Sequence, residues 1–464
     1  MYLYTKMIND LLKALRESNL GARIGLIPTG NPAHADDIAI VTLHKPNLKK
    51  LLDIAYKYSC TWHFEFNASK TEVLIFGEDA CPKLHLSLGD KIISVRQGAS
   101  HMGIALTSNR KYECEYVQDK INSAKRAYYC VQGLGNSHIP VTPMISSKLY
   151  WAISIPIMTH GMEIATLSEQ SVRRMEQAHG EMAKCIQNLP PQTSNCACLA
   201  PLGWTSMECF LDRLKLMFLW RLLLMSVNSI YKQVAIAKLC YYLYQCTDSS
   251  NHTSPIPDML NTFRKYNILC VLIDGITTGC YMPIEKFKVL VKTSIAKVEN
   301  ERFSISCSMY KTLGIFTQCI PMIKLWSWWT FAMKRPDKTH SCILIARLMY
   351  GESSLNVHTA RFQNNYDVCC QYCDIMTPQT VAHLLFQCTN EQIEACRARC
   401  LEKLVNSMPN GLKTDFLNME DSSKVILILS GMHIPYINEW EDVYESMADF
   451  IYKMYNTHSE LVTV

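Results

Sequence analysis

Four potential metal ligands follow one another in the last quarter of the sequence, at Cys370, Cys373, His383 and Cys388. The Cys-x-x-Cys spacing lets two thiolates turn toward one ion, and the histidine and the last cysteine can close a tetrahedron from a short helix or turn. A filled shell of this kind is typical of structural Zn²⁺. The pattern therefore predicts that this stretch folds around one zinc ion.

Two alternatives to this ligand set stay open. The chain contains 21 cysteines, so four residues of the ligand type can share a stretch by coincidence. Cys369 can also take the place of Cys370, at a wider spacing from Cys373. Further along, Cys396 and Cys400 lie one helical turn apart and are interpreted as spare buried thiols.

The composition is that of a folded chain. Of its 464 residues, 48% are apolar and 19% are charged, which suits two to four domains with sizeable cores. The net charge of +5 permits nucleic-acid binding without arguing for it. The N-terminus lacks a signal-peptide pattern, and no uncharged apolar run approaches the roughly 20 residues of a membrane span. We therefore expect an intracellular protein without a membrane span, in which most thiols are reduced.

Two adjacent carboxylates occur at Asp36 and Asp37, between the turn-forming Asn31-Pro32 and a run of Ile and Val. This pattern predicts a strand, a tight turn that carries both acids, and a returning strand. Adjacent carboxylates repel each other unless a hard cation lies between them, and Mg²⁺ prefers such oxygen ligands. The pair is therefore a candidate site for two-metal phosphoryl transfer. Taken alone, such a dipeptide is more often a solvated turn.

The sequence after the acid pair adds two features. An amphipathic helix is expected over 48–58, and Asn67-x-x-Lys70-Thr71 then precedes an apolar strand. This order closely resembles the reverse transcriptase of non-LTR retrotransposons, in which an aromatic-Ala-Asp-Asp turn, a helix and Asn-x-x-Lys-Thr follow one another. His34 stands where that family has its aromatic residue.

The resemblance implies an RNA-directed DNA polymerase by ancestry, with RNA and DNA, as an RNA–DNA hybrid, for partners. In the complete family Asp36 and Asp37 would join an upstream Asp to bind two Mg²⁺, and Lys70 would lie near the incoming nucleotide. The ending His383-x4-Cys388 also resembles the zinc-binding knuckle in the tail of that family.

Only the C-terminal half of the family is covered, from the late palm to the tail. The fingers and the earlier palm strand, with its own catalytic Asp, have no counterpart before Met1. Two-metal catalysis needs carboxylates from two strands, so we expect the chain as given to be inactive as a polymerase. Two other interpretations stay open. One is a noncatalytic nucleic-acid-binding or protein-interaction module built on the thumb and the zinc knuckle; the other is a retrotransposon fragment with no selected role.

A helix expected after the palm carries Lys120, Lys125 and Arg126 together with Tyr128 and Tyr129. Basic residues mixed with aromatic ones suit a thumb helix that follows a duplex through phosphate contacts. A solvated basic face is the commoner explanation of such a run.

Other segments have patterns that predict secondary structure. Apolar spacing predicts helices at 4–17 and 211–224 and a final helix around 440–454, and alternation predicts a hairpin around Gly89-Asp90. The segment 101–106 resembles the primer grip of the family, and 156–163 resembles its Pro-x-x-Thr-x-Gly-x-Glu signature. A sheet edge explains the first of these two equally well.

A linker is expected at 247–257, which is rich in Ser, Thr, Asn and Pro. Beyond it, Trp326, Trp328 and Trp329 can stack on bases, but in so apolar a region they more often fill a core.

The predicted fold class is α+β. We expect a partial reverse-transcriptase palm at 1–110, a helical thumb and connection at 111–246, and a further helical region at 258–350. A zinc knuckle at 361–400 and a helical tail at 401–464 complete the chain.

Overall fold

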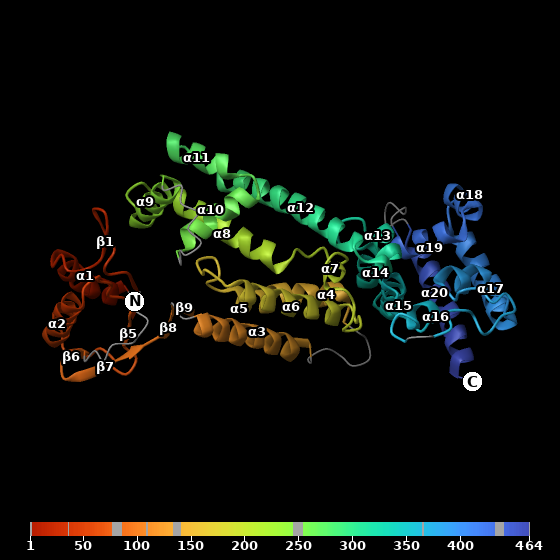
Figure 1. Cartoon of the computed structure of the whole chain (residues 1–464), viewed down its shortest axis with the longest axis horizontal. Coiled ribbons are helices and arrows are strands. Elements are labelled where there is room, and N and C mark those ends of the chain that lie inside the picture. Colours follow the sequence, from red (N-terminus) through yellow and green to blue (C-terminus); the bar gives the residue numbers. More distant parts are fainter. Residues whose placement is uncertain are drawn as a thin grey trace. The chain divides into compact units, whose positions relative to one another are not determined.

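A computed structural model gives the structure of the protein and describes residues 2–35, 37–76, 86–107, 110–132, 141–244, 254–363, 366–431 and 440–463. Helices dominate these residues and the strands form small sheets, which confirms the α+β class (Figure 1). The chain divides into two compact units that interleave along the sequence. The first unit comprises Met1–Gln118, His160–Ser171 and Leu211–Ser294, and the second comprises Asp119–Thr159, Val172–Phe210 and Ile295–Val464.

The N-terminal part of the first unit is built on two amphipathic helices, α1 (Tyr2–Glu17) and α2 (Lys45–Thr61). Both were expected from their apolar spacing. Pro46 occupies the first turn of α2, where its missing N–H leaves no helical hydrogen bond unmade. The apolar faces of the helices and of two later strands share one core, which contains Leu11, Leu15, Leu51, Leu52, Ala55, Leu86, Leu88 and Ile93.

A three-stranded sheet covers part of this core. Its strands are β5 (Glu72–Leu74), β6 (Leu86–Leu88) and β7 (Lys91–Arg96), in the order β5-β7-β6. β6 and β7 pair antiparallel across Gly89 and Asp90, which confirms the predicted hairpin. Gly89 has φ +63°, a left-handed conformation that side chains with a Cβ rarely adopt. β5 pairs with β7 in parallel.

A second hairpin, β8 (Gly98–His101) and β9 (Ile104–Thr107), contains the segment that resembles the primer grip. Met102 and Gly103, which join its strands, both have positive φ, as a two-residue turn between twisted strands requires. His160 Nε2 lies 3.1 Å from the carbonyl oxygen of Met102. The structure thus brings into contact two segments whose sequences resemble the reverse-transcriptase family, although 58 residues separate Met102 from His160.

The helix before His160 is irregular for a reason visible in the sequence. α4 (Pro143–Leu149) widens into a π-helical turn at Tyr150–Ser154 and then continues as α5 (Ile155–Thr159). Pro156 has no N–H to donate back along the helix, and a wider turn accommodates that loss.

The rest of the described chain is helical. The longer helices are α3 (Arg110–Gln132), α6 (Glu169–Ile186), α8 (Met207–Leu223), α9 (Ile230–Tyr244), α10 (Pro255–Lys265), α11 (Leu269–Thr278), α12 (Ile284–Ser308), α14 (Ser327–Lys334), α15 (Thr339–Tyr350), α17 (Glu391–Ser407), α18 (Asn410–Asn418), α19 (Asp421–Ser430) and α20 (Glu441–Thr463). α8 and α20 confirm two predicted apolar helices. Among the described residues, every helix is too short or too polar to cross a lipid bilayer.

The predicted linker at 247–257 is partly wrong. Residues 247–253 lie outside the described residues, but Ser254 is the N-cap of α10 and Pro255 is its first residue. Proline is common in the first turn of a helix, because the N–H that it lacks would have no helical partner there. Serine and proline thus begin a helix at this place instead of continuing a linker.

The core of the second unit contains the tryptophan cluster. Trp326, Trp328 and Trp329 are at most 2% exposed, so the core interpretation is confirmed for them. Their indole N–H groups donate to the Ser430 carbonyl, the Ile428 carbonyl and the Gln187 side-chain oxygen respectively. Indole rings satisfied in this way hold α14 against α19 and against the residue that follows α6.

Two glutamates, the half-buried Glu176 and the buried Glu299, lie at the N-terminus of α8 in the second unit. Glu176 Oε2 accepts hydrogen bonds from the backbone N–H groups of Met207 at 2.7 Å and Glu208 at 3.3 Å, and Glu299 Oε1 accepts from the N–H of Ser206. Burial raises the pKa of Glu176 to about 7, with a smaller contribution from the nearby Glu299 carboxylate, although the two backbone N–H groups lower it.

We expect the ionisation of Glu176 to lower the free energy of unfolding as the pH rises from about 4.5 to 7. Its folded-state pKa lies above the unfolded value of 4.5, so its contribution is fully present below pH 4.5 and is lost as the pH rises through 7. The loss amounts to about 3 kcal/mol. Glu176→Gln keeps an oxygen acceptor for both N–H groups and should remove this part of the pH dependence. Urea unfolding between pH 4.5 and 8, followed by tryptophan fluorescence, measures it. A constant difference between the two proteins at all pH values would contradict the assignment.

Candidate metal centre

The four predicted zinc ligands meet in the second unit. The ligand atoms of Cys370, Cys373, His383 and Cys388 all lie within 4.8 Å of one another. Cys370, His383 and Cys388 are buried and Cys373 is half-buried. Three thiols and one imidazole nitrogen are a donor set that suits a tetrahedral zinc ion. The predicted ligand set is therefore brought together, and the cluster could hold a metal such as zinc.

Local backbone structure explains why these residues converge. The chain turns back on itself between Cys370 and Thr377. An antiparallel bridge of Cys369 with Pro378 and one hydrogen bond, from the Cys370 N–H to the Thr377 carbonyl at 2.9 Å, close this turn. His383 begins a π-helical turn, His383–Gln387, and the N–H of Cys388 closes this turn by donating to the His383 carbonyl at 2.7 Å. The short helical turn that was expected to carry the last two ligands is thus present.

The alternative first ligand, Cys369, is not among the four converging residues. Successive residues of an extended segment point in opposite directions, so only one of Cys369 and Cys370 can face the ion. Cys370 is 4% exposed and faces the cluster, whereas Cys369 is half-buried. The structure therefore places Cys370, and not Cys369, in the cluster.

Side chains around the cluster orient its ligands. His383 Nδ1 lies 3.0 Å from Thr377 Oγ1, and His383 Nε2 lies 3.5 Å from Cys373 Sγ. A hydrogen bond from the Nδ1–H to the threonine leaves Nε2 with its lone pair directed at the thiols, which is the form of the ring that binds a metal. Burial lowers the pKa of His383, and the Arg397 charge lowers it further, so the neutral ring is favoured.

Gln379 connects the cluster to two other parts of the chain. Its Oε1 accepts from the N–H of Asn356 at 2.9 Å, and its Nε2 lies 3.6 Å from Cys370 Sγ and 2.9 Å from His458 Nε2. The amide therefore gives one hydrogen to the thiol ligand and one to the histidine of α20. Sequence reasoning missed Thr377, Gln379 and His458. The only signal for the first two is their position between Cys373 and His383, and His458 has none.

Neighbouring thiolates in the cluster would repel one another when no cation lies between them. Burial and the neighbouring Cys370 and Cys373 thiols raise the pKa of Cys388 to about 12. The pKa of Cys373 is lowered, because hydrogen bonds from the Ile375 N–H and neighbouring thiols outweigh the effect of its burial. A divalent cation would favour the thiolate form of Cys388, which is the reason that metal uptake at such clusters releases protons.

The acid pair lies in the first unit. β3 (Ala33–His34) and β4 (Asp37–Ile38) pair antiparallel, with His34 opposite Asp37, so a hairpin forms where it was predicted. Asp37 is exposed and belongs to the returning strand, so the expectation that the turn carries both acids is wrong for Asp37. Asp36 lies outside the described residues. Ala35, before it, has φ +53°, as a tight two-residue turn requires.

Lys70 lies in a compact turn that the motif itself builds. The Asn67 carbonyl accepts from the N–H groups of Lys70 and Thr71, both at 3.1 Å, and from Thr71 Oγ1 at 2.9 Å. Asn67 Oδ1 accepts from the N–H of Ser69 at 3.1 Å. These bonds explain why Asn and Thr occupy those positions and leave the Lys70 side chain exposed.

The acid hairpin and the Lys70 turn are anchored on the same core. Ile38 and Ile40, which follow the acids, and Val73, which follows Lys70, all pack against it. The hairpin and β5 nevertheless belong to separate sheets. Within the described part of the chain, Asp37 belongs to no group of three potential metal ligands, and Mg²⁺ binding here remains a prediction.

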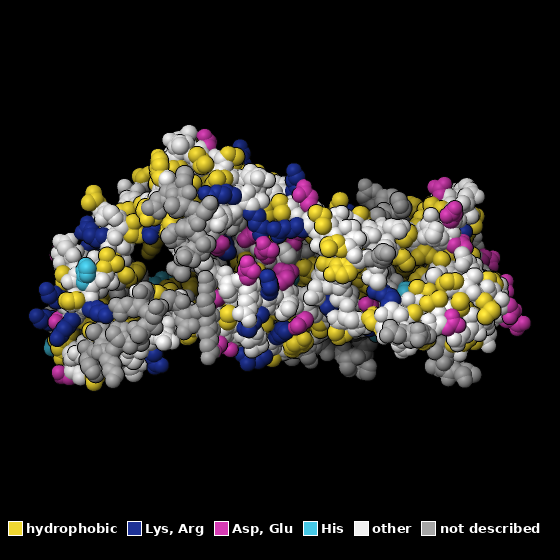
Figure 2. Space-filling view, viewed as in Figure 1, with side chains coloured by type: hydrophobic (Ala, Val, Ile, Leu, Met, Phe, Trp, Pro, Cys, Tyr) yellow, Lys and Arg dark blue, Asp and Glu magenta, His cyan; other side chains and the backbone are white. Residues whose placement is uncertain are grey.

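The basic helix α3 differs in part from the expected binding face. Lys125 Nζ lies 2.6 Å from Glu181 Oε2 on α6, so its charge is largely compensated. Tyr128 is 2% exposed and belongs to the core, whereas Tyr129 is half exposed. Arg126 is exposed, with a hydrogen bond to Ser123 Oγ at 3.1 Å. On the face that Figure 2 shows, basic and acidic side chains lie next to one another.

The fold and this site define an α+β protein with a Cys3His cluster suited to a structural metal ion. No family model matches the chain, and no curated protein matches it either.

Proposed function

We propose that the chain is a reverse-transcriptase-like protein of the non-LTR retrotransposon type that binds nucleic acid and carries a structural zinc ion in its tail. The observation that supports this most is the arrangement of the acid hairpin, the helix α2 and the Asn67–Thr71 turn on one core, in the chain order of that family. The zinc cluster follows at the end, as in the tail of the family.

The proposed partner is an RNA–DNA hybrid bound through its phosphates. Two lysines of α12 in the first unit, Lys288 and Lys292, have exposed side chains. Residues four apart lie on the same face of a helix, so the two lysines form one basic row. Binding that depends on phosphate contacts carries no sequence preference and weakens steeply with salt.

We expect the affinity for an RNA–DNA hybrid to fall linearly on a plot of log K against log salt. The double charge reversal Lys288→Glu, Lys292→Glu should make this slope less steep by about 2, because each phosphate contact contributes about 0.9 to its magnitude. The control, Lys13→Glu with Lys413→Glu, changes the net charge equally on other helices and should leave the slope unchanged. Fluorescence anisotropy between 50 and 300 mM salt (about the range in which such contacts weaken) measures it. A salt-independent or absent interaction would favour the protein-interaction module instead.

We expect the 464-residue chain to show no Mg²⁺-dependent primer extension. Two-metal catalysis needs ions held by carboxylates from separate strands, and Asp37 has no such partners among the described residues. Extension of oligo(dT) on poly(rA) with Mg²⁺ or Mn²⁺ should equal that of the Asp36→Ala, Asp37→Ala double variant. Metal-dependent extension that the double variant abolishes would contradict this prediction.

A further inference from the structure

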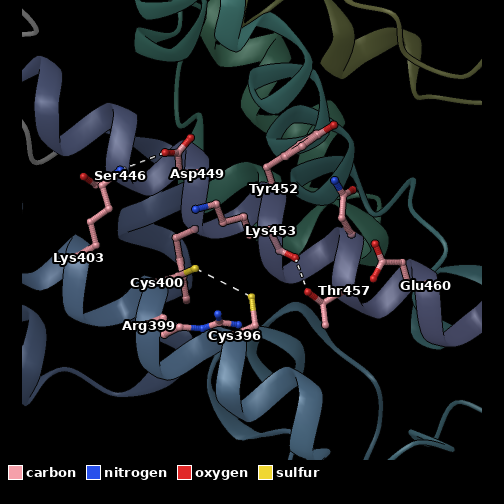
Figure 3. A pocket seen from close by; sticks show the side chains of 12 residues that line it. Cys396, Arg399, Cys400, Lys403, Ser446, Asp449, Tyr452, Lys453, Thr457 and Glu460 are labelled. Atoms are coloured by element: carbon pink, nitrogen blue, oxygen red, sulfur yellow. Dashed lines mark hydrogen bonds and ion pairs between the residues drawn. The ribbon is translucent and has the colours of Figure 1, made fainter.

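A second pair of thiols lies outside the zinc cluster, on one face of α17. Cys396 and Cys400 are four residues apart, and their Sγ atoms are 4.0 Å from each other. Cys396 is 7% exposed, but Cys400 is only half-buried, so the interpretation of both as buried thiols is wrong for Cys400. Both thiols line an open cavity of about 490 Å³ between α17 and α20, into which they point (Figure 3).

The spacing of these thiols does not suit a disulfide. Side chains four apart on a helix have Cβ atoms about 5–6 Å from each other, whereas a disulfide needs about 3.5–4.5 Å. A single ion suits them better. Two thiolates bound tetrahedrally at about 2.3 Å from one ion lie roughly 3.8 Å apart, which is close to the separation of 4.0 Å in this structure.

The cavity around the pair is open to solvent and carries charges of both signs, with Asp449 and Glu460 beside three basic residues. Arg399, Lys403 and Lys453 line the same cavity and can offset the charge of two thiolates, while Lys403 also lies 3.3 Å from Asp449 Oδ2. Among the described residues that line this cavity, Cys396 and Cys400 are the thiols close enough to share one ion, so its other coordination positions would open into the cavity. An ion held in this way exchanges with solvent, unlike one enclosed by four protein ligands.

We propose that Cys396 and Cys400 form a second metal site, which takes a thiophilic divalent cation such as Cd²⁺ in exchange for two protons. The two S–H bonds break, their protons pass to solvent, and two metal–sulfur bonds form, so the charge at the site does not change. Soft thiolate ligands favour such ions over Mg²⁺ or Ca²⁺. The site is independent of the proposed nucleic-acid binding.

The test is a Cd²⁺ titration of the zinc-loaded full chain, followed by the ultraviolet sulfur-to-cadmium absorption and by the zinc released. The wild type should bind one more Cd²⁺ than Cys400→Ser or Cys396→Ala, at equal zinc release. Cys60→Ser removes an exposed thiol elsewhere and should behave like the wild type. Two ligand variants are used, so that a folding defect in one does not decide the result.

Equal cadmium binding by the wild type and both ligand variants would overturn the proposal. It would also be overturned if mild oxidation joined the two thiols in the folded protein, because the spacing would then suit a disulfide. Release of two protons per additional Cd²⁺, absent from both variants, would support it.

Discussion

Removal of zinc is expected to unfold the stretch around residues 366–400 and to loosen the end of α20. The four ligands are gathered by short turns, so the metal supplies much of the local folding free energy; in zinc-finger peptides metal binding contributes about 10–16 kcal/mol at neutral pH. The Gln379 amide, which links Cys370 to His458, carries the effect to α20. Hydrogen exchange with and without a chelator should show lost protection in both segments.

Neighbouring cysteines provide a matched control for this prediction. Cys370→Ser should lower the zinc content from one ion per chain to nearly none, because a filled tetrahedral shell loses a buried thiolate. Cys369→Ser alters the adjacent thiol, which lies outside the cluster, and should retain zinc. Metal analysis of both purified variants decides this. Equal zinc in the two variants, or unchanged exchange after chelation, would contradict the assignment of the cluster as a structural centre.

Trp328→Ala is expected to lower the free energy of unfolding of the second unit by about 3–5 kcal/mol, the range for large aromatic residues in a core. Trp328 is fully buried, packs against Tyr444 with a ring-centroid distance of 4.9 Å, and donates its indole N–H to the Ile428 carbonyl at 3.1 Å. The substitution leaves a cavity and an unpaired carbonyl oxygen. Urea unfolding measures the effect.

Variants of Trp328 can distinguish packing in the protein core from stacking on nucleic-acid bases. Trp328→Phe should lose less stability than Trp328→Ala, and neither should weaken hybrid binding while the protein remains folded. Trp62→Ala is the control, because Trp62 is 50% exposed and its removal should cost little. Weaker hybrid binding by Trp328→Phe at unchanged stability would show that the indole contacts bases after all.

Local patterns predicted much of the secondary structure. The β6–β7 hairpin, α8 and α20 follow from spacing within a few residues, and so does the convergence of Cys373 with His383. Contacts between distant residues could not be predicted in this way. Lys125 meets Glu181 across 56 residues, and no local pattern indicates that the lysine of an apparently free basic face is paired.

The same limit applies to neighbouring side chains. Tyr128 and Tyr129 are adjacent in the sequence, yet successive helical residues point about 100° apart, so one enters the core and the other faces solvent. Which of the two is buried depends on Tyr150, whose ring contacts Tyr128 from another helix. Likewise, the sequence around Asp37 predicts a hairpin but not which residue the turn contains.

The contacts of Gln379 have a consequence for the order of events during protein synthesis. His458 follows Cys388, the last of the four ligands, by 70 residues, so a ribosome that adds about 5–20 residues per second needs roughly 4–14 seconds to extend the chain from one to the other. During that interval all four thiol and imidazole ligands have been synthesised, but the helix that completes their surroundings has not. A nascent chain can therefore capture its metal ion before it completes the shell around that ion.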